Sequence, residues 1–430
     1  MINIFWMRRD LRLNDNKGLW EALTKGLPVR IIFIFDIQIL QKLDNPNDRR
    51  VSFIYNRILE LNRQLKPFNS EIQCFYGSVK ESFERLLKET SIHAVFTNRD
   101  YEPYGIQRDK EIHAYLHQRG VQFMDFKDHV IFETKEIIKD DGDPYRIYTP
   151  YSKKWKERYY SCQQESWNSE QLLSRLDKNQ ATDIVLLKTM GFNVIEGIRT
   201  EPEVNTDIIA QYDKTRNTPS IAGTSLLGPH LRFGTVSIRA LAKQASEINE
   251  TYLNELIWRE FFSQILFHYP HVTAGAFKPK YDNILWRNGQ DELLRWQEGK
   301  TGFPLVDAGM RELAETGFMH NRVRMVVASF LVKDLLIDWR IGEAWFARHL
   351  LDYELASNNG NWQWAAGTGC DAAPYFRIFN PQAQQKRFDP SWLYVKKWIP
   401  EYGTSKYPNE MVDHKMARQR ALETYKEALN

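Results

Sequence analysis

The first 130 residues alternate between short β-rich runs and segments with helical periodicity. The β-rich runs are apolar and occupy residues 2–7, 29–36, 71–76, 94–98 and 121–126. Helical patterns lie between them, near residues 47–65, 78–89 and 105–119. A chain in which strands and helices alternate folds into a parallel sheet covered by helices. We therefore expect an α/β domain with a Rossmann-like parallel sheet in this part of the chain.

The rest of the chain has a different character. Polar, irregular sequence from about residue 134 to 205 predicts a connector, and helical periodicity with few β-branched runs follows it. A chain of 430 residues is also too long for one ordinary core. We expect three parts, namely an α/β domain over residues 1–133, an interdomain connector over residues 134–205 and an all-α domain over residues 206–430.

The turn after the first strand lacks the glycine-rich motif of dinucleotide-binding domains. A run rich in Arg and Asp over residues 8–16 stands where Gly-x-Gly-x-x-Gly would lie. That motif depends on glycines because the backbone must approach a diphosphate closely. The sequence therefore does not support a standard dinucleotide-binding domain.

Bulk properties exclude several classes of protein. The net charge is only +3, so any affinity for nucleic acid must come from local clusters of basic residues. No apolar run approaches the ~20 residues that span a bilayer, and the first residues lack the layout of a signal peptide. Three widely spaced cysteines argue against disulfide and zinc frameworks. We expect a cytoplasmic protein without a metal site.

Residues 358–381 combine aromatic, amide and small side chains in a way that ordinary core elements do not. Trp362 and Trp364 stand among small residues, which let the backbone approach a flat ligand closely. Asn358 and Asn359 supply amide donors and acceptors, and Arg377 adds one cation. This set suits a planar, electron-rich ligand better than a metal or a phosphate alone.

Two helical stripes elsewhere carry polar side chains among apolar ones. Residues at i, i+3, i+4 and i+7 share one face of a helix. The members are Glu255, Trp258, Arg259 and Phe262 in the first stripe and Asn321, Arg324, Met325 and Ala328 in the second. A solvent-facing ion pair beside a core tryptophan explains the first stripe about equally well. A buried arginine in the second stripe needs a carboxylate partner, which Asp352 or Glu354 can supply.

A segment with hydroxyl groups over residues 224–228 precedes a helical pattern. Hydroxyl groups and free amides at a helix entrance can hold a diphosphate, although an ordinary helix cap has the same kind of sequence. Basic residues interleaved with aromatic ones follow in the C-terminal half, an arrangement that holds phosphates while bases stack on rings. Solvated surface charges are the competing explanation for many of these basic residues.

Several motifs, taken in order, resemble the photolyase/cryptochrome flavoprotein family along essentially the whole chain. They occupy residues 9–12, 15–16, 223–225, 254–260, 299–308 and 358–381. Within the family the chain is similar to class I cyclobutane pyrimidine dimer (CPD) photolyases. The resemblance implies an N-terminal antenna domain and a C-terminal helical domain that holds a folded FAD, reduced in the active form. It also implies a monomer whose partner is UV-damaged DNA and which has no contact with membranes.

The sequence around Asn321 separates dimer photolyases from their relatives. Dimer photolyases carry His-Asn-Arg and then Met four residues after the Asn, as this chain does with His320, Asn321, Arg322 and Met325. Photolyases for (6-4) lesions usually carry a pair of histidines here, and light-sensing cryptochromes usually carry a long C-terminal extension. A (6-4) photolyase and a blue-light-sensing cryptochrome-like flavoprotein are therefore the alternatives, ranked below CPD repair.

The resemblance assigns roles by matching positions. In the family, light excites the reduced flavin, which passes one electron to a flipped-out dimer. The residues expected at the lesion are Glu255, Asn321, Met325, Trp258 and Trp364. Those expected to bind FAD are Tyr212, Thr224, Ser225, Leu226, Leu227, Gly228, Arg324, Asp352, Tyr353, Glu354 and Asn358. Among them, Arg324 and Asp352 are expected to form an ion pair beside the flavin ring. Those expected to carry electrons during photoreduction are Trp286, Trp339 and Trp362, and those expected to contact DNA are Arg216, Arg259, Arg322, Arg377 and Gln384.

The resemblance is less definite for a second, light-harvesting chromophore. Candidate pocket residues in the N-terminal domain are Asp36, Arg50, Asp100, Glu102 and Arg108. Tyr104 and Gly105 replace the Asn-Glu pair of folate-type photolyases, which favours the deazaflavin or FMN type. Ile106 replaces an Arg common in that type, so the chromophore stays open between deazaflavin, FMN and folate, or is absent. Two further departures are Gly228, where the family usually has Ser, and Glu354, where Asp is common.

Overall fold

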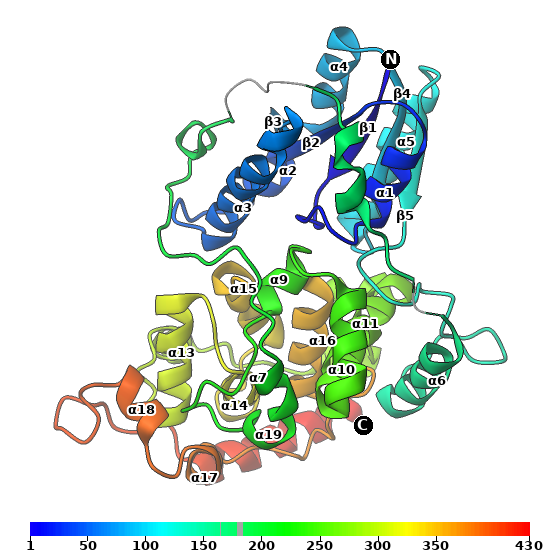
Figure 1. The fold of residues 1–430 in the computed structure, drawn as a ribbon. Helices are drawn as coiled ribbons and strands as arrows, with labels where there is room; N and C mark the ends of the chain where they lie inside the picture. Colours follow the sequence, from blue (N-terminus) through cyan, green and yellow to red (C-terminus); the bar gives the residue numbers. More distant parts are fainter. Residues whose placement is uncertain (164, 179–183) are drawn as a thin grey trace. The chain divides into compact units, whose positions relative to one another are not determined.

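The computed structural model describes residues 1–163, 165–178 and 184–430 and divides into two compact units (Figure 1). Unit 1 comprises Met1–Glu136, Lys156–Val204 and Leu227–Ser246, and unit 2 comprises Ile137–Trp155, Asn205–Leu226 and Glu247–Asn430. The structure thus divides the expected connector between the units. Its buried side chains explain this, since Tyr151 and Trp155 belong to the core of unit 2 whereas Leu173 and Leu187 belong to that of unit 1. The boundary expected at residue 206 also differs, because residues 227–246 belong to unit 1.

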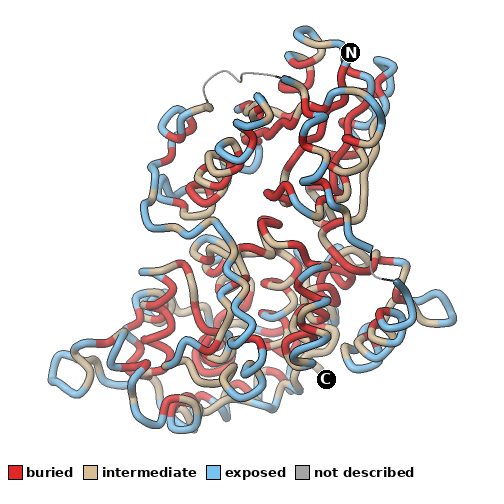
Figure 2. Tube along the Cα trace, in the orientation of Figure 1, coloured by how far each residue is buried: buried red, intermediate tan, exposed pale blue. Residues whose placement is uncertain are grey.

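Unit 1 is built on a five-stranded parallel sheet with the strand order β3-β2-β1-β4-β5. Its strands are β1 (Ile2–Met7), β2 (Val29–Asp36), β3 (Gln73–Gly77), β4 (Ile92–Asn98) and β5 (Gln122–Phe126). The central strand β1 is buried along its whole length, as Figure 2 shows. The expected α/β domain is therefore confirmed.

Helices join the strands of unit 1 in the alternating order that the sequence predicts. They are α1 (Lys17–Thr24), α2 (Ile37–Leu40), α3 (Arg49–Leu65), α4 (Val79–Glu89) and α5 (Pro103–His117), followed later in the chain by α9 (Gly228–Arg232) and α10 (Ile238–Ile248), with the 3-10 turns η1 (Lys66–Phe68), η2 (Ser169–Arg175) and η3 (Leu187–Met190). Polar side chains fix several helix starts. Asn16 accepts a hydrogen bond from the Leu19 amide in α1, and Ser78 and Glu81 form a capping box in α4.

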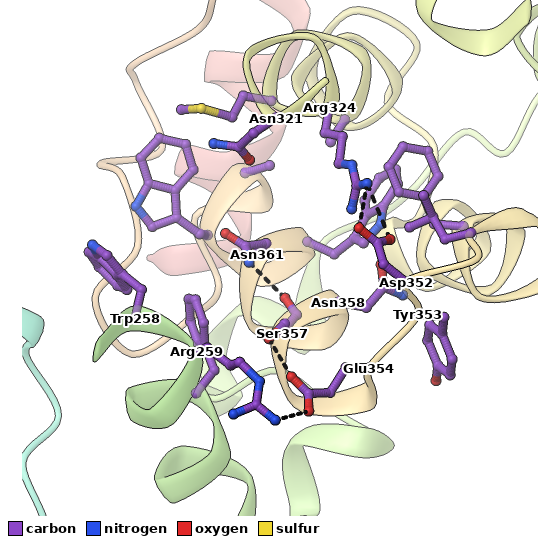
Figure 3. Close-up of a pocket in the computed structure, with 18 of the residues that line it drawn as sticks. Trp258, Arg259, Asn321, Arg324, Asp352, Tyr353, Glu354, Ser357, Asn358 and Asn361 are labelled. Carbon is purple, nitrogen blue, oxygen red and sulfur yellow. Dashed lines mark hydrogen bonds and ion pairs between the residues drawn. The ribbon is translucent and has the colours of Figure 1, made fainter. Parts of the chain in front are cut away.

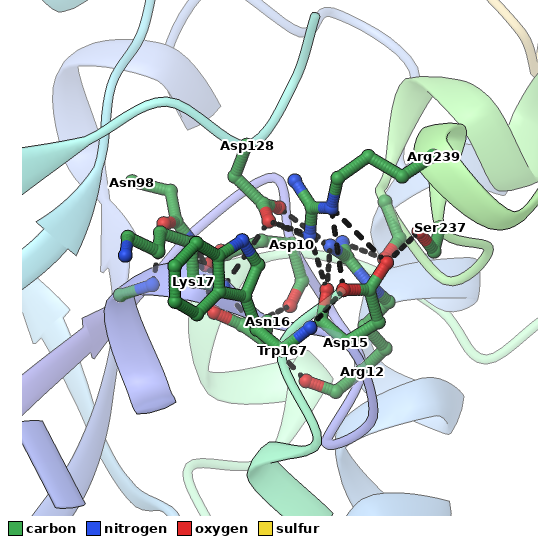
Figure 4. A network of polar contacts seen from close by, with 12 residues as sticks. Asp10, Arg12, Asp15, Asn16, Lys17, Asn98, Asp128, Trp167, Ser237 and Arg239 are labelled. Atoms are coloured by element: carbon green, nitrogen blue, oxygen red, sulfur yellow. Dashed lines mark hydrogen bonds and ion pairs between the residues drawn. The ribbon is translucent and has the colours of Figure 1, made fainter. Parts of the chain in front are cut away.

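The charged run after β1 forms a buried ion-pair network within unit 1 (Figure 4). Arg12 is 2% exposed and donates to both carboxylate oxygens of Asp128, at 2.8 and 2.7 Å. Arg239 of α10 lies 2.7 Å from Asp128 and 3.1 Å from Asp15. Burial alone would raise the pKa of Asp128, but the two guanidinium groups outweigh it and hold that pKa below its usual value. The run that replaces a glycine-rich turn therefore joins α10 to the edge of the sheet.

Unit 2 is helical. Its helices are α7 (Thr206–Ala210), α8 (Tyr212–Thr215), α11 (Glu250–His268), α12 (Gln290–Gln297), α13 (Pro304–Thr316), α14 (Asn321–Ser329), α15 (Trp339–His349), α16 (Leu355–Ala366), α17 (Pro381–Phe388), α18 (Leu393–Trp398) and α19 (His414–Leu429), with the 3-10 turns η4 (Pro270–Thr273) and η5 (Pro279–Asn283), the π-helical segment η6 (Phe330–Asp334) and the first half of α6 (Tyr148–Ser161). This arrangement confirms the expected all-α domain.

Helix α16 packs against α11, α14 and α15 in unit 2. Two glycines permit the close approach. A Cβ atom at Gly360 would lie 2.1 Å from the ring of Phe262 in α11, and one at Gly342 in α15 would lie 2.2 Å from the ring of Trp362. The main core of unit 2 is rich in indoles, among them Trp296, Trp339 and Trp362. The helices that carry the predicted site residues are therefore held against one another.

No helix among residues 1–163, 165–178 and 184–430 is long and apolar enough to cross a membrane. In the same ranges, no group of three or more His, Cys, Asp or Glu side chains is placed to hold a metal ion. Cys74, Cys162 and Cys370 form no disulfide in the described part of the chain.

We expect Asp128→Asn to destabilise unit 1, because the substitution removes the countercharge that Arg12 and Arg239 share. Removing one partner of a buried ion pair costs about 3–5 kcal/mol. Differential scanning calorimetry should show this loss in the transition of unit 1. The control Glu89→Gln, which breaks an exposed pair with Arg85, should cost less than about 1 kcal/mol. Equal losses in the two variants would contradict the structural role assigned to the network.

Candidate functional site

A cavity of about 330 Å³ opens in unit 2, lined from α11, α14 and α16 and from the segment before α16 (Figure 3). Its wall mixes charged, amide and aromatic side chains. The predicted site and stripe residues in this wall are Arg216, Glu255, Trp258, Arg259, Phe262, Asn321, Arg324, Met325, Ala328, Asp352, Tyr353, Glu354, Asn358, Trp362 and Trp364. Both helical stripes and the segment around Asn358 therefore meet at one hollow.

Glu255 and Arg216 form an ion pair in this wall, with 2.6 Å between Oε1 and Nη1. Burial raises the pKa of Glu255, and the nearby guanidinium lowers it by less, so the net pKa lies above the usual value for glutamic acid. The side chain is nevertheless 30% exposed, so a ligand can reach it. Glu255 is thus easier to protonate than an ordinary surface carboxylate.

Arg259 pairs with Glu354 and not with Glu255 on its own helix. The distance from Nη2 to Oε1 is 3.2 Å, and the two side chains are only 10% and 7% exposed. Glu354 also accepts a hydrogen bond from the hydroxyl of Ser357 at 3.1 Å, so the contacts continue from α11 into α16 (Figure 3). The solvent-facing ion pair considered for this stripe is therefore replaced by a buried pair that joins two helices.

Arg324 finds its carboxylate partner in Asp352. Its Nη2 lies 3.2 and 2.9 Å from the two carboxylate oxygens, and its Nε donates to the backbone oxygen of Met319 at 2.7 Å. Of the two partners that the sequence offered, Asp352 is therefore the one used. Asn321 begins α14, and Met325 follows one turn later on the same wall.

Asn358 is oriented by a glutamate from the neighbouring helix. Its side-chain nitrogen donates to the carboxylate of Glu343 at 2.8 Å and to the backbone oxygen of Glu343 at 3.1 Å. Burial raises the pKa of Glu343, and the hydrogen bond from Asn358 only partly offsets it. Because Nδ2 is engaged with α15, the orientation of the Asn358 amide at the cavity is fixed.

The three tryptophans expected to carry electrons lie in or against one hydrophobic cluster. Trp362 lines the cavity and is 2% exposed, and Trp339 lies in the same core. Trp286 is partly buried and packs against that core from outside. Two of the indoles are thus buried and the third is partly buried, and their role in electron transfer stays a prediction.

Several other predicted residues do not line the cavity. They are Tyr212, Thr224, Ser225, Leu226, Leu227, Gly228, Trp286, Trp339, Arg322, Arg377 and Gln384. The segment 224–228 begins in unit 2 and ends in unit 1, where α9 starts without a side-chain cap. In unit 2, Arg322 donates to the side chain of Asn217 at 2.6 Å, and Arg377 is exposed. The expected diphosphate site and these DNA contacts stay predictions.

The five candidate antenna residues lie in unit 1, and all of them have polar partners. Asp36 accepts a hydrogen bond from the Tyr104 hydroxyl. The ion pairs are Arg50–Asp48 at 2.5 Å, Arg9–Asp100 at 3.2 Å, Arg9–Glu102 at 2.9 Å and Arg108–Asp109 at 3.0 Å. Asp100 also borders a small cavity of about 10 Å³. Their role as a chromophore pocket stays a prediction.

Sequence reasoning missed several residues at the site. The wall also contains Phe346, Leu350, Ser357, Asn361 and Ala365. Tyr148, in the segment expected to be a connector, stacks on Trp258 with 3.6 Å between ring centroids. The sequence does contain a pattern that predicts a buried helix face here, because Tyr148, Tyr151 and Trp155 recur at i, i+3 and i+7.

We expect Glu343→Gln to stabilise unit 2 at alkaline pH. The raised pKa means that the folded state favours the protonated form, so the contribution of Glu343 to stability is present at low pH and lost as pH rises through that pKa. Glutamine at this position still offers a side-chain oxygen that can accept the hydrogen bond from Asn358, and it carries no charge. Melting temperatures of the variant and the parent should agree near pH 4 and diverge at pH 8, with the variant higher. The exposed control Glu427→Gln should show no such divergence, and a parent more stable at pH 8 would contradict the burial argument.

Known protein families match this chain in two stretches. The family model for DNA photolyase matches residues 3–170, and the model for the FAD binding domain of DNA photolyase matches residues 252–405. A deoxyribodipyrimidine photo-lyase from Synechococcus sp. is 35% identical over 98% of this chain and 96% of its own.

Solved structures give the same result. The crystal structure of a bacterial class III photolyase from Agrobacterium tumefaciens matches with a TM-score of 0.89 and 32% identity, over 99% of this chain and 97% of its own. An archaeal photolyase from Sulfolobus tokodaii, solved with two FAD molecules, matches with a TM-score of 0.85 and 32% identity, over 99% of this chain and 100% of its own. Because matches in sequence and structure run along nearly the whole chain, the protein belongs to the DNA photolyase family.

Proposed function

We propose that this protein repairs cyclobutane pyrimidine dimers in DNA, using light absorbed by reduced FAD. The observation that carries the proposal is the wall of the unit 2 cavity. There an acid with a raised pKa, an amide, a thioether and two indoles surround one hollow, formed by Glu255, Asn321, Met325, Trp258 and Trp364. Membership of a family whose curated relatives bear the name deoxyribodipyrimidine photo-lyase supports the same reaction.

The residues of the cavity fit a flavin. Flat apolar surface comes from side chains such as Phe346 and Trp362, and amide and hydroxyl groups come from Asn358, Asn361 and Ser357. We propose that Arg324, Asp352, Tyr353, Glu354 and Asn358 hold the ring system and ribose, and that Tyr212, Thr224, Ser225, Leu226, Leu227 and Gly228 hold the diphosphate. Bound reduced FAD would supply the light-driven electron that opens the dimer, and this electron would return to the flavin once the two pyrimidines have separated. An uncharged amide such as Asn358 adds no like charge beside an electron-rich flavin.

Glu255 is the proposed proton-bearing group at the lesion. A protonated carboxylic acid donates a hydrogen bond, which stabilises negative charge that develops on a pyrimidine carbonyl. Asn321 would add a second donor at the same edge, and Met325 would pack on the lesion. Trp258 and Trp364 would supply aromatic faces for an everted base pair, which costs less to extrude than intact bases because a dimer is poorly stacked.

The histidine next to Asn321 speaks against (6-4) repair. His320 is 4% exposed and does not line the cavity, and its Nδ1 accepts a hydrogen bond from the Arg322 amide. Burial and nearby arginines lower the pKa of His320 to about 4, so the ring stays neutral at physiological pH. The cavity wall therefore does not present the proton-donating pair of histidines that (6-4) repair uses.

Within CPD repair, class I stays our proposal, although a class III enzyme is among the structural relatives.

DNA binding and light harvesting complete the proposal. Arg216, Arg259, Arg322, Arg377 and Gln384 would contact DNA, and the exposed Arg377 is the most accessible of them to phosphate. Unit 1 would hold a second chromophore near Asp36, Arg50, Asp100, Glu102 and Arg108, whether deazaflavin, FMN or folate.

The Sulfolobus relative was solved with two FAD molecules, which favours a flavin as the second chromophore of this protein. An absorption spectrum of the purified protein would reveal the FAD bands and any additional antenna band. A cytoplasmic monomer remains our expectation.

Repair of a thymine-dimer oligonucleotide by the reduced, illuminated protein tests the function directly. We expect Glu255→Ala to lower the repair yield by about 2- to 12-fold, the equivalent of one hydrogen bond of about 0.5–1.5 kcal/mol, without loss of flavin. In the parent, the yield should fall as pH rises through the raised pKa of Glu255, because only the protonated acid donates. Glu255→Gln should flatten this profile. No light-dependent repair by the parent would exclude the proposed function and leave the light-signalling and (6-4) alternatives, which an oligonucleotide with a (6-4) lesion would separate.

The proposed electron path has its own test. Trp362→Phe should slow photoreduction of oxidised flavin, because phenylalanine is far harder to oxidise than an indole. The same variant, reduced chemically beforehand, should repair dimers nearly as well as the parent. Equal losses in photoreduction and in repair would show that Trp362 shapes the cavity and does not carry electrons.

A further inference from the structure

Tyr148 covers one face of Trp258. The two ring centroids are 3.6 Å apart and the ring planes differ by 5°, which is a nearly parallel stack. Tyr148 begins α6 and Trp258 lies in α11, and both belong to unit 2. Trp258 lines the cavity, whereas Tyr148 does not. The face that Tyr148 covers is therefore the one turned away from the hollow.

Neighbouring aromatic rings restrict Trp258 further. Phe261 meets the indole nearly edge-on, at 5.7 Å and 83°, and Phe262 lies at 5.5 Å and 30°. Together with Tyr148 these rings leave the indole little freedom to tilt. The cavity-facing surface of Trp258 is thus held in a fixed plane before any ligand arrives.

Tyr148 is itself held at both ends. Its hydroxyl donates to the backbone oxygen of Asn254 at 2.9 Å, and its backbone amide donates to the carboxylate of Asp371 at 3.0 Å. Asp371 lies in the loop that also carries Arg377. The ring cannot move off Trp258 without breaking at least one of these bonds.

The helix behind Tyr148 is also anchored to α11. The indole nitrogen of Trp155 donates to the carboxylate of Glu260 at 2.7 Å, and the Tyr151 hydroxyl lies 3.4 Å from the same oxygen. Tyr151, Trp155 and Glu260 are all buried. The first turns of α6 and the helix that carries Trp258 therefore form one rigid piece.

We infer that Tyr148 is a positioning residue for lesion binding, which fixes the plane of Trp258 so that an everted pyrimidine can stack on its other face. The inference rests on the proposed function, in which Trp258 contacts the dimer. Stacking on an aromatic side chain contributes strongly to the binding of each unpaired base, and a ring already held in place loses less entropy when the base arrives.

Binding in the dark tests the inference without relying on repair. We would measure the affinity of the FAD-loaded protein for a duplex with one thymine dimer and for its undamaged twin. Tyr148→Leu removes the stack and should weaken dimer binding by about tenfold, with binding of undamaged duplex unchanged. Tyr148→Phe keeps the ring and loses only the bond to Asn254, so it should stay within about twofold of the parent. Tyr160→Leu, an exposed tyrosine on the same helix, is the matched control.

A double-mutant cycle separates positioning from general structural support. In a Trp258→Ala background, Tyr148→Leu should cost nothing further, because there is no indole left to position. The flavin content of every variant should match that of the parent. If Tyr148→Leu does not fold, Tyr148→Met takes its place in both experiments. Equal or tighter dimer binding by Tyr148→Leu would overturn the inference, the tighter result showing that Tyr148 occupies the place of the base. Equal weakening on both duplexes would also overturn it. A parent without preference for dimer DNA would overturn the proposed function as well.

Discussion

The wall of the unit 2 cavity depends on the pairing of partly buried charges. Three ion pairs, Arg216–Glu255, Arg259–Glu354 and Arg324–Asp352, each join segments that are distant in the sequence. A buried charge without a partner is strongly unfavourable, so these pairs fix which helices face one another. Glycines then let α16 approach α11 and α15 closely enough to bring Asn358 and Trp362 to the hollow.

The two tryptophans proposed to hold a lesion are kept in place by other kinds of contact than the charged groups of the wall. Trp364 lies on α16, two residues after Trp362, whereas Trp258 is braced by Tyr148 from another part of the chain. Polar residues of the wall are positioned mostly by ion pairs and hydrogen bonds. Aromatic residues are positioned by stacking and by close packing. A cavity built in both ways can present charge and flat surface together without either being free to rearrange.

Much of this structure could be predicted from local patterns. Alternating periodicity gave the parallel sheet, and the spacing of Glu255, Trp258 and Arg259 placed them on one helix face. Spacing alone left the partner of Arg324 open between Asp352 and Glu354 and gave none for Arg259, because these pairings depend on distances between helices. The resemblance to the family named the Arg324–Asp352 pair, and the structure confirms it. The stacking of Tyr148 on Trp258 was also missed, but for a different reason. Its helix is short of apolar residues, so the polar composition of the segment outweighed the spacing of its aromatic rings.

The two units are interleaved along the chain, and this affects how the protein can be made. Asp128 lies just after the last strand of the sheet, but its partner Arg239 comes from a segment that follows two stretches of unit 2. At about 5–20 residues per second, ribosomal synthesis reaches that arginine on the order of ten seconds after the sheet is complete. During this interval the nascent sheet carries a carboxylate that only Arg12 neutralises. A fragment that ends between Asp128 and Arg239 would keep that incomplete state permanently, so the two units are poor candidates for separate expression as simple halves.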